Sequence, residues 1–215
     1  RNAGALLEND EQDGLAHFLE HMAFQGTKNF PGKGIITSLE KHGVSFGRNI
    51  NAYTAQNETV YNLSDVPTNS ESLLDTCLLI LHDWSYYLTL EDDEIDAERG
   101  VITEEWRTRR TPQFRIQKQM FPVLFKDSKY AIRDVIGNLD VIKNFKYQTI
   151  RDFYHEWYRT DLEAIAIVGD FDVAKMEQKV KELFSKIPAV ENPTPRPFYE
   201  IPEHDEMYYC LATDK

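Results

Sequence analysis

Two histidines and a glutamate near the start of the chain carry side chains that could do chemistry together. His17, Glu20 and His21 fall in the stretch His-Phe-Leu-Glu-His. Residues four apart on an α-helix lie about one turn along the same face, so the two imidazoles would point the same way. A zinc hydrolase needs two such nitrogen ligands, a third protein ligand, an open position for water and a base beside it. Glu20 is a candidate for that base.

The order His-x-x-Glu-His inverts the common zinc-peptidase signature and is typical of the inverzincins. Three such residues can also meet by accident, and the alternative is then a zinc-free α/β domain. The motif becomes a site only if the rest of the chain supplies a third ligand. The other histidines have no comparable partner in the sequence: His42, His82, His155 and His204.

The motif helix is expected to run to about Phe24 and to end at Gly26. Its apolar residues recur at helical spacing and predict a face that packs on the core. The histidines must therefore lie at the border of that face or within it.

A second, acidic helix is the candidate source of the third ligand. It is predicted from the acidic cluster at 91–94, which suits a helix N-terminus, to about Arg110. Residues seven apart return to nearly the same face, so Glu98 and Glu105 share a stripe, whereas Glu104 is turned about 100° away. A carboxylate stripe is usually a solvated face. This stripe borders apolar residues, so part of it lies near the core. Either Glu98 or Glu105 could therefore be the third ligand.

The remaining pattern predicts an α+β fold, in which helices pack on an antiparallel sheet within a single domain. We expect two strands of a hairpin at 44–54 and 59–64, and further strands at 162–168 and 207–211. Residues 187–197 contain four prolines and read as an extended segment. Helices are predicted at these further ranges: 35–41, 68–88, 114–125 with an interruption or end at Pro122, 149–158 and 173–186.

Composition excludes some classes of function. The 215 residues carry a net charge of −12, which argues against a nucleic-acid partner because phosphate binding needs lysine and arginine. The sequence has no apolar run of transmembrane length, and Cys77 and Cys210 make no disulfide framework. The chain starts at Arg1 and ends just after an apolar run, so we expect a piece of a longer protein.

Several blocks in order resemble the peptidase M16 family, which includes pitrilysin, insulin-degrading enzyme and the mitochondrial processing peptidase. The resemblance is strongest to its bacterial PqqL-like zinc proteases, and it covers nearly the whole chain. The blocks are HFLEHMAFQGT at 17–27, NAYT at 51–54, ETVY at 58–61, AERGVITEEWR at 97–107 and IVGDF at 167–171.

The resemblance implies a role for each matching residue. His17 and His21 match the two zinc-binding histidines, and Glu20 matches the catalytic glutamate. The third ligand of the family is the later glutamate of the acidic run, which selects Glu105. Glu98 matches an acid that supports the ligands from behind. One zinc ion per chain is the implied cofactor.

The resemblance also implies a substrate and partners. Asn51, Ala52 and Tyr53 match an edge strand along which an extended peptide pairs its backbone. The sheet order and the motif helix over the sheet, as in the related LuxS-like metallohydrolases, follow from the resemblance too. We expect residues 1–215 to be the N-terminal, zinc-bearing module, with its first strands and a homologous second half absent from this sequence. The second half would lie in the same or a partner chain, and the module alone would be a poor protease.

The PqqL-like branch suggests the bacterial periplasm or cell envelope as the location. The alternative function is a catalytically silent scaffold or peptide-binding subunit, although such family members usually lack part of the motif.

Overall fold

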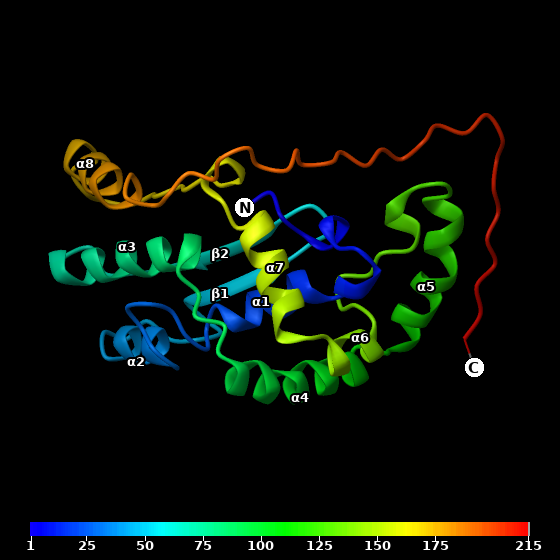
Figure 1. The fold of residues 1–215 in the computed structure, drawn as a ribbon, viewed down its shortest axis with the longest axis horizontal. Helices are drawn as coiled ribbons and strands as arrows, with labels where there is room; N and C mark the ends of the chain where they lie inside the picture. The colour runs from blue at the N-terminus through cyan, green and yellow to red at the C-terminus, as the bar shows by residue number, and fades with distance from the viewer. Residues whose placement is uncertain (215) are drawn as a thin grey trace.

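The protein has an α+β fold in which helices surround a two-stranded antiparallel sheet (Figure 1). It is described by a computed structural model that covers residues 1–214. The strands are β1 (Ile50–Thr54) and β2 (Thr59–Leu63). The α-helices in the described part of the chain are α1 (Leu15–Met22), α2 (Gly34–Glu40), α3 (Glu71–Tyr86), α4 (Asp92–Thr108), α5 (Pro112–Leu124), α6 (Leu139–Asn144), α7 (Tyr147–Trp157) and α8 (Val173–Phe184).

Short 3-10 turns connect some of these elements: Ala5–Leu7, Asp10–Gln12, Lys129–Ala131 and Thr160–Leu162. The hairpin pairs residues Ile50 to Thr54 with Leu63 to Thr59 in register. Helix α1 packs against both strands and also against α4 and α7. It therefore lies at the centre of the molecule, where few of its side chains reach solvent.

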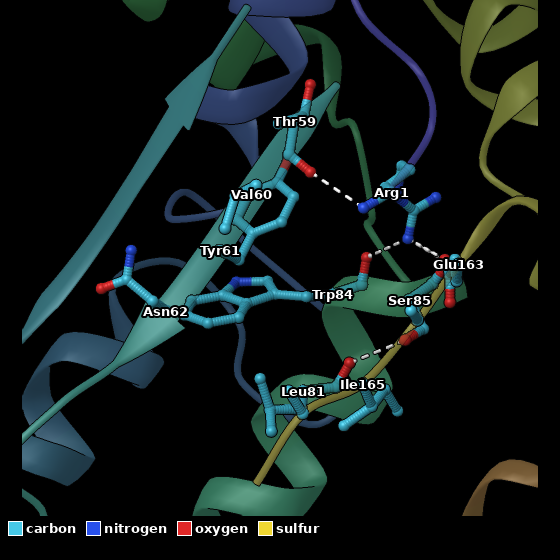
Figure 2. A pocket seen from close by; sticks show the side chains of 12 residues that line it. Arg1, Thr59, Val60, Tyr61, Asn62, Leu81, Trp84, Ser85, Glu163 and Ile165 are labelled. Carbon is cyan, nitrogen blue, oxygen red and sulfur yellow. Dashed lines mark hydrogen bonds and ion pairs between the residues drawn. The ribbon is translucent and has the colours of Figure 1, made fainter. Parts of the chain in front are cut away.

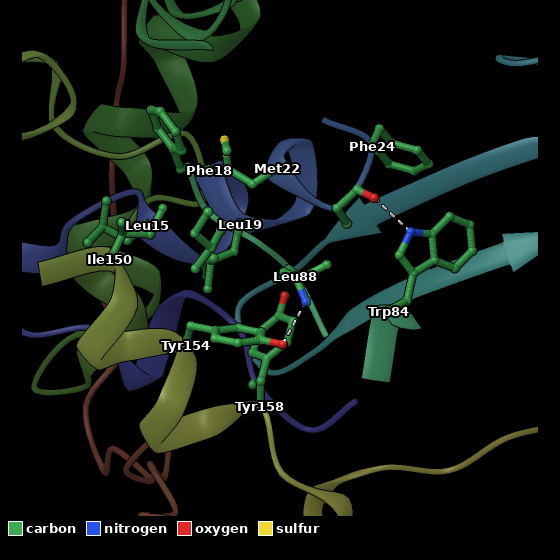
Figure 3. Packing of buried hydrophobic residues seen from close by; sticks show 14 of the residues in the cluster. Leu15, Phe18, Leu19, Met22, Phe24, Trp84, Leu88, Ile150, Tyr154 and Tyr158 are labelled. Carbon is green, nitrogen blue, oxygen red and sulfur yellow. Dashed lines mark hydrogen bonds between the residues drawn. The ribbon is translucent and has the colours of Figure 1, made fainter. Parts of the chain in front are cut away.

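The hydrophobic core forms around α1 (Figure 3). Leu15, Phe18, Leu19 and Met22 are each at most 1% exposed, as the helical spacing of these residues predicts. Trp84 from α3 lies at the C-terminal end of α1, and its indole Nε1 donates a hydrogen bond to the carbonyl of Ala23 at 2.8 Å. Apolar burial of this extent is the main stabilising term for the helix that carries the motif.

The long helices agree well with the sequence pattern. Helix α4 begins at Asp92 with three acidic residues in its first turn, as expected for side chains near the positive end of a helix dipole. Helix α3 begins at Glu71 rather than near Thr68, because Ser70 is its N-cap and accepts a hydrogen bond from the amide of Leu73. Helix α5 continues through Pro122 to Leu124, so the predicted interruption there is wrong.

Three of the strand predictions are wrong in whole or in part. Residues 47–49 form a turn, Phe46 makes only an isolated bridge to Ile50, and β1 begins at Ile50. Residues 162–168 and 207–211 form no strand, and both contain side chains exposed to solvent, including Val168 at 97% and Leu211 at 92%. Alternating apolar residues favour a strand, but a strand also needs a neighbour for its backbone hydrogen bonds. No described strand pairs with either segment.

One such segment faces β2 across a cavity (Figure 2). The cavity has a volume of about 330 Å³ and lies between the outer edge of β2 and residues 163–166. Arg1 closes one end of it: its backbone exchanges hydrogen bonds with Thr59, and its guanidinium forms an ion pair with Glu163. Beyond this segment, residues 185–214 contain no helix or strand and run along the outside of the molecule to α5 (Figure 1).

Candidate metal centre

Helix α1 is held at its N-terminus by a buried carboxylate. Glu8 is fully buried, and its two oxygens accept hydrogen bonds from the amides of Gly14 at 3.0 Å and Ala16 at 2.8 Å. The first amides of a helix have no partner within the helix, so this contact satisfies two of them. Gly14 has φ +105°, and a Cβ there would lie 3.0 Å from Gly137, so glycine suits the position.

Helix α4 crosses α1 in the opposite direction and is fixed from its other side. Arg99 donates hydrogen bonds to the carbonyls of Ile142 and Phe145 at the end of α6, at 2.6 and 2.7 Å. Trp106 donates to the carbonyl of Gly137 at 3.2 Å. These contacts turn the stripe that carries Glu98 and Glu105 towards α1.

His17, His21 and Glu105 come together where the two helices meet. The Oε2 atom of Glu105 lies 3.3 Å from Nε2 of His21 and 3.6 Å from Nε2 of His17. Ligand atoms from the three side chains lie within 4.8 Å of one another, and this is the one group of the kind among residues 1–214. Glu104, in contrast, points away and pairs with Arg107.

The distances from Glu105 to the two histidines fit a tetrahedral zinc ion. Ligands about 2.0–2.1 Å from zinc at tetrahedral angles lie roughly 3.3–3.4 Å apart, which is close to both observed separations. Two imidazole nitrogens and one carboxylate oxygen are also a ligand set that zinc hydrolases use, with a fourth position left for water. The residues present therefore fit the metal.

The two histidines differ in protonation. Burial, and then the charge of His21, lower the pKa of His17 to about 4, so its ring is neutral and able to bind a metal. Burial also opposes the charged form of His21, but its contacts with Glu105 and Glu98 outweigh burial and raise its pKa to about 9. A metal at the cluster would take the place of the proton on His21.

Glu105 offers one oxygen to the cluster and uses the other elsewhere. Its Oε1 forms an ion pair at 2.5 Å with Arg109, the residue that caps the C-terminus of α4. The contact with His21, together with the charges of His17 and Arg109, lowers the pKa of Glu105 to about 2 although burial opposes this. The carboxylate is therefore ionised, as a metal ligand must be.

Glu98 supports His21 from behind. Its Oε1 accepts a hydrogen bond from Nδ1 of His21 at 2.8 Å, and its Oε2 accepts one from Nε2 of Gln25 at 2.5 Å. Metal-binding histidines commonly donate their second ring nitrogen to a carboxylate in this way, which fixes the tautomer and the ring orientation. In contrast, Nδ1 of His17 is buried without a hydrogen-bond partner among the described residues.

Glu20 lies beside the cluster without joining it. Its Oε2 accepts a hydrogen bond from Oγ1 of Thr54, the last residue of β1, at 2.6 Å. Burial raises the pKa of Glu20, and the hydrogen bond from Thr54 opposes this shift. A partly buried carboxylate next to a metal cluster, with a raised pKa, is suited to accept and return a proton.

A cavity of about 370 Å³ borders the cluster along β1. Glu20, His21 and Glu98 line it, as do Asn51 and Ala52. Tyr53 does not line it: its hydroxyl donates to Glu58 across the hairpin turn at 3.1 Å, and its side chain is 48% exposed.

Of the supporting side chains, the family resemblance predicted Glu98, whereas Thr54, Gln25 and Arg109 were not predicted. Thr54 and Gln25 both fall in blocks that resemble the M16 family, yet a hydroxyl and an amide carry no metal-binding signal of their own. Arg109 could have been found, because it lies four residues after Glu105 and a carboxylate four residues before an arginine favours an ion pair on a helix.

Comparison with known protein families places this geometry in context. The sequence profile of insulinase, peptidase family M16, matches residues 2–126, and that of the peptidase M16 inactive domain matches residues 144–214. The chain belongs to the M16 peptidase family. The resemblance of the motif blocks is thereby confirmed.

Individual relatives agree with this assignment. The chain is 40% identical over 192 residues to the probable zinc protease PqqL of Haemophilus influenzae, and it is 29% identical over 195 residues to the mitochondrial-processing peptidase subunit beta of Saccharomyces cerevisiae. These matches cover 89% and 90% of this chain but 20% and 40% of those relatives.

The fold agrees with a solved structure. The first half of the periplasmic protease PqqL from Escherichia coli has a TM-score of 0.86 and 38% identity, covering 91% of this chain and 42% of that one. The antiparallel α+β architecture expected from the sequence is thus confirmed. The chain spans about a fifth of the length of the PqqL relatives it matches. No helix among residues 1–214 has the length and apolarity that a membrane crossing requires.

Proposed function

We propose that this chain is the metal-bearing module of a zinc metallopeptidase that hydrolyses peptide bonds. The observation that carries the proposal is the meeting of His17, His21 and Glu105 at separations of 3.3 and 3.6 Å that suit one zinc ion. Membership of the M16 family, with relatives named zinc proteases, supports it. One zinc ion per chain is the proposed stoichiometry.

The residues around the cluster divide the work of hydrolysis. A zinc ion held there would supply Lewis-acid polarisation of the scissile carbonyl and would make a bound water more acidic. Glu20 accepts the proton of the attacking water and passes it to the leaving amine. Thr54 holds Glu20, and Glu98 holds His21 with its Nε2 towards the cluster.

The proposed substrate is an extended peptide that pairs with β1. Asn51 and Ala52 lie on this strand beside the cavity that reaches Glu20 and His21, so a peptide along the strand would pass the cluster. Tyr53 would contribute through its backbone. Main-chain pairing gives affinity with little dependence on sequence, which suits peptides or unfolded polypeptides.

A second homologous M16 half, in the same or a partner chain, would complete the enzyme. In support, the chain matches 42% of the solved first half of PqqL from Escherichia coli, and a fifth of whole PqqL relatives. That structure is described as a periplasmic protease. We propose the periplasm or cell envelope as the location on this basis.

Replacing the base while keeping the ligands tests the proposal. In the full-length protein, we expect Glu20→Gln to retain zinc and to lose chelator-sensitive peptide cleavage by about 100-fold or more, since general-base catalysis typically contributes 10²–10⁴-fold. Glu40→Gln, at an exposed position on α2, is the matched control and should leave cleavage unchanged. A wild-type protein that binds zinc and peptides without cleaving them would instead support the silent scaffold.

A further inference from the structure

Gln25 makes a contact that neither the motif nor the zinc ligands account for. It lies in the turn that follows α1, four residues after His21. Its Nε2 donates to Oε2 of Glu98 at 2.5 Å, while Oε1 of the same carboxylate accepts from Nδ1 of His21 at 2.8 Å. Glu98 is thus held at one oxygen by a residue of α1 and at the other by a residue of the turn that follows α1.

The burial of Glu98 makes this second contact important. The residue is 4% exposed, so water does little to satisfy whichever oxygen lacks a protein donor. A buried carboxylate oxygen without a hydrogen-bond donor is energetically unfavourable. Removing its donor therefore incurs the full desolvation penalty of that oxygen. The terminal torsion of a glutamate is also broad, so one hydrogen bond alone does not fix the plane of the carboxylate. Two donors, one at each oxygen, fix it.

The orientation of His21 depends on that plane more than the orientation of His17 does. The second ring nitrogen of His17 has no hydrogen-bond partner among the described residues, and its ring is held by burial. The side chain of His21 is 22% exposed, and its second nitrogen is held by Glu98. Glu98 therefore orients the less buried of the two histidines.

We propose that Gln25 is a positioning residue of the metal centre. Its amide holds the carboxylate of Glu98, so that Glu98 keeps the Nδ1–H of His21 and Nε2 of His21 stays directed at Glu105. This inference rests on the proposed function, because it assigns Gln25 a role in zinc binding.

If Gln25 served only to hold its turn in place, loss of its side chain would destabilise the fold. The turn that contains it is already anchored by backbone bonds, from the amide of Gln25 to the carbonyl of Met22 at 3.0 Å and from Thr89 to Gly26 at 3.2 Å. Loss of the side-chain amide should therefore spare the fold and affect the zinc site.

The experiment measures zinc affinity by competition with a chromophoric chelator, in the full-length protein. We expect Gln25→Met, which keeps the side-chain length and removes the donor, to weaken zinc binding about tenfold, the lower end of the range for residues that support metal ligands. Gln25→Asn, which keeps an amide too short to reach Glu98, should weaken it similarly. Gln178→Met is the matched control, because Gln178 makes the same kind of bond to Glu182, at 2.7 Å, on an exposed helix face.

A double-mutant cycle shows whether Gln25 acts through Glu98. In a Glu98→Ala background, Gln25→Met should change zinc affinity less than twofold, since the carboxylate it positions is gone. An equal effect in both backgrounds, or an unchanged affinity in both Gln25 variants, overturns the inference and leaves the proposed function intact. Failure of the wild-type protein to bind zinc overturns both. Thermal unfolding of each variant identifies any that does not fold. If one Gln25 variant does not fold, the zinc affinity of the other tests the inference.

Discussion

At the scale of single residues, the protonation states of Glu105 and His17 already suit metal binding. Glu105 is ionised, with a pKa lowered to about 2, and His17 is neutral at physiological pH, with a pKa lowered to about 4. Only His21 carries a proton that a metal must displace, since its pKa is raised to about 9. The sign of the pH dependence follows from that proton.

Zinc affinity should rise with pH. Between about pH 5 and 9, each zinc ion that binds releases one proton from His21, so we expect the dissociation constant to fall about tenfold for each unit of rising pH and to level off near pH 9. The proton of His17 does not compete above pH 5. Chelator competition at a series of pH values, corrected for protonation of the chelator, measures the slope. A dissociation constant that is constant from pH 6 to pH 9 would contradict the assignment of His21.

Residue types and spacing predict a stripe of carboxylates along α4, and no more than that. Glu98 and Glu105 share a face of α4, but periodicity alone could not say which of them is the ligand. The choice depends on the direction in which α4 crosses α1, which is a tertiary property. The structure places Glu98 in contact with Gln25, and Oε2 of Glu105 within 3.6 Å of Nε2 of both His17 and His21.

At the scale of elements, the hydrogen bonds of Glu8 at the N-terminus of α1 stabilise the fold. Glu8→Ala removes the acceptor for the amides of Gly14 and Ala16 in a fully buried position. We expect the free energy of unfolding to fall by about 2 kcal/mol, at the upper end for loss of a helix cap. Urea denaturation measures the change. Glu11→Ala, at an exposed position nearby, should change it by less than about 0.5 kcal/mol. Equal effects of the two variants would contradict this role for Glu8.

The hydrogen bond from β1 to Glu20 couples the proposed substrate strand to the base. Thr54→Val removes the hydroxyl and nearly keeps the shape, so Glu20 loses the donor that holds it. We expect kcat to fall about tenfold in the full-length protein, with KM and zinc content unchanged, because the change affects positioning for the reaction. Thr54→Ser should restore most of the activity. A Thr54→Val enzyme with wild-type kcat would show that Glu20 does not need this support.

Helices were predicted from the sequence better than strands, for a physical reason. Helix α4 satisfies its backbone within itself, so its acidic start and apolar periodicity determine its extent. The segment at 162–168 has the apolar composition of a strand, but its backbone needs a neighbour that the described residues do not provide. Composition shows that a segment can pair, and only the tertiary structure shows with what.

At the scale of the whole molecule, the chain brings the candidate ligands His17, His21 and Glu105 together within a small part of the length of its PqqL relatives. Residues of α1, α2, α4 and β1 line the cavity beside the cluster, and we expect further protein to enclose a peptide bound there. An enclosed site positions substrate and excludes water better than an open one.

Separating the chain from the rest of the protein should therefore preserve zinc binding and reduce the rate of peptide cleavage. We expect residues 1–215 alone to bind one zinc ion with an affinity similar to that of the full-length protein, and to cleave a peptide at least about 100-fold more slowly. Zinc titration and a fluorogenic peptide assay on the two proteins measure both quantities. Equal cleavage rates would show that the enclosing half is not needed.

The proposed hydrolysis requires Glu105 to complete a zinc site with His17 and His21. The most direct measurement is the zinc affinity of Glu105→Ala compared with Glu104→Ala, which removes the neighbouring carboxylate that points away from the cluster. We predict one zinc ion per chain for the wild type and for Glu104→Ala, and at least about 100-fold weaker binding for Glu105→Ala. Wild-type zinc affinity in Glu105→Ala would contradict the account.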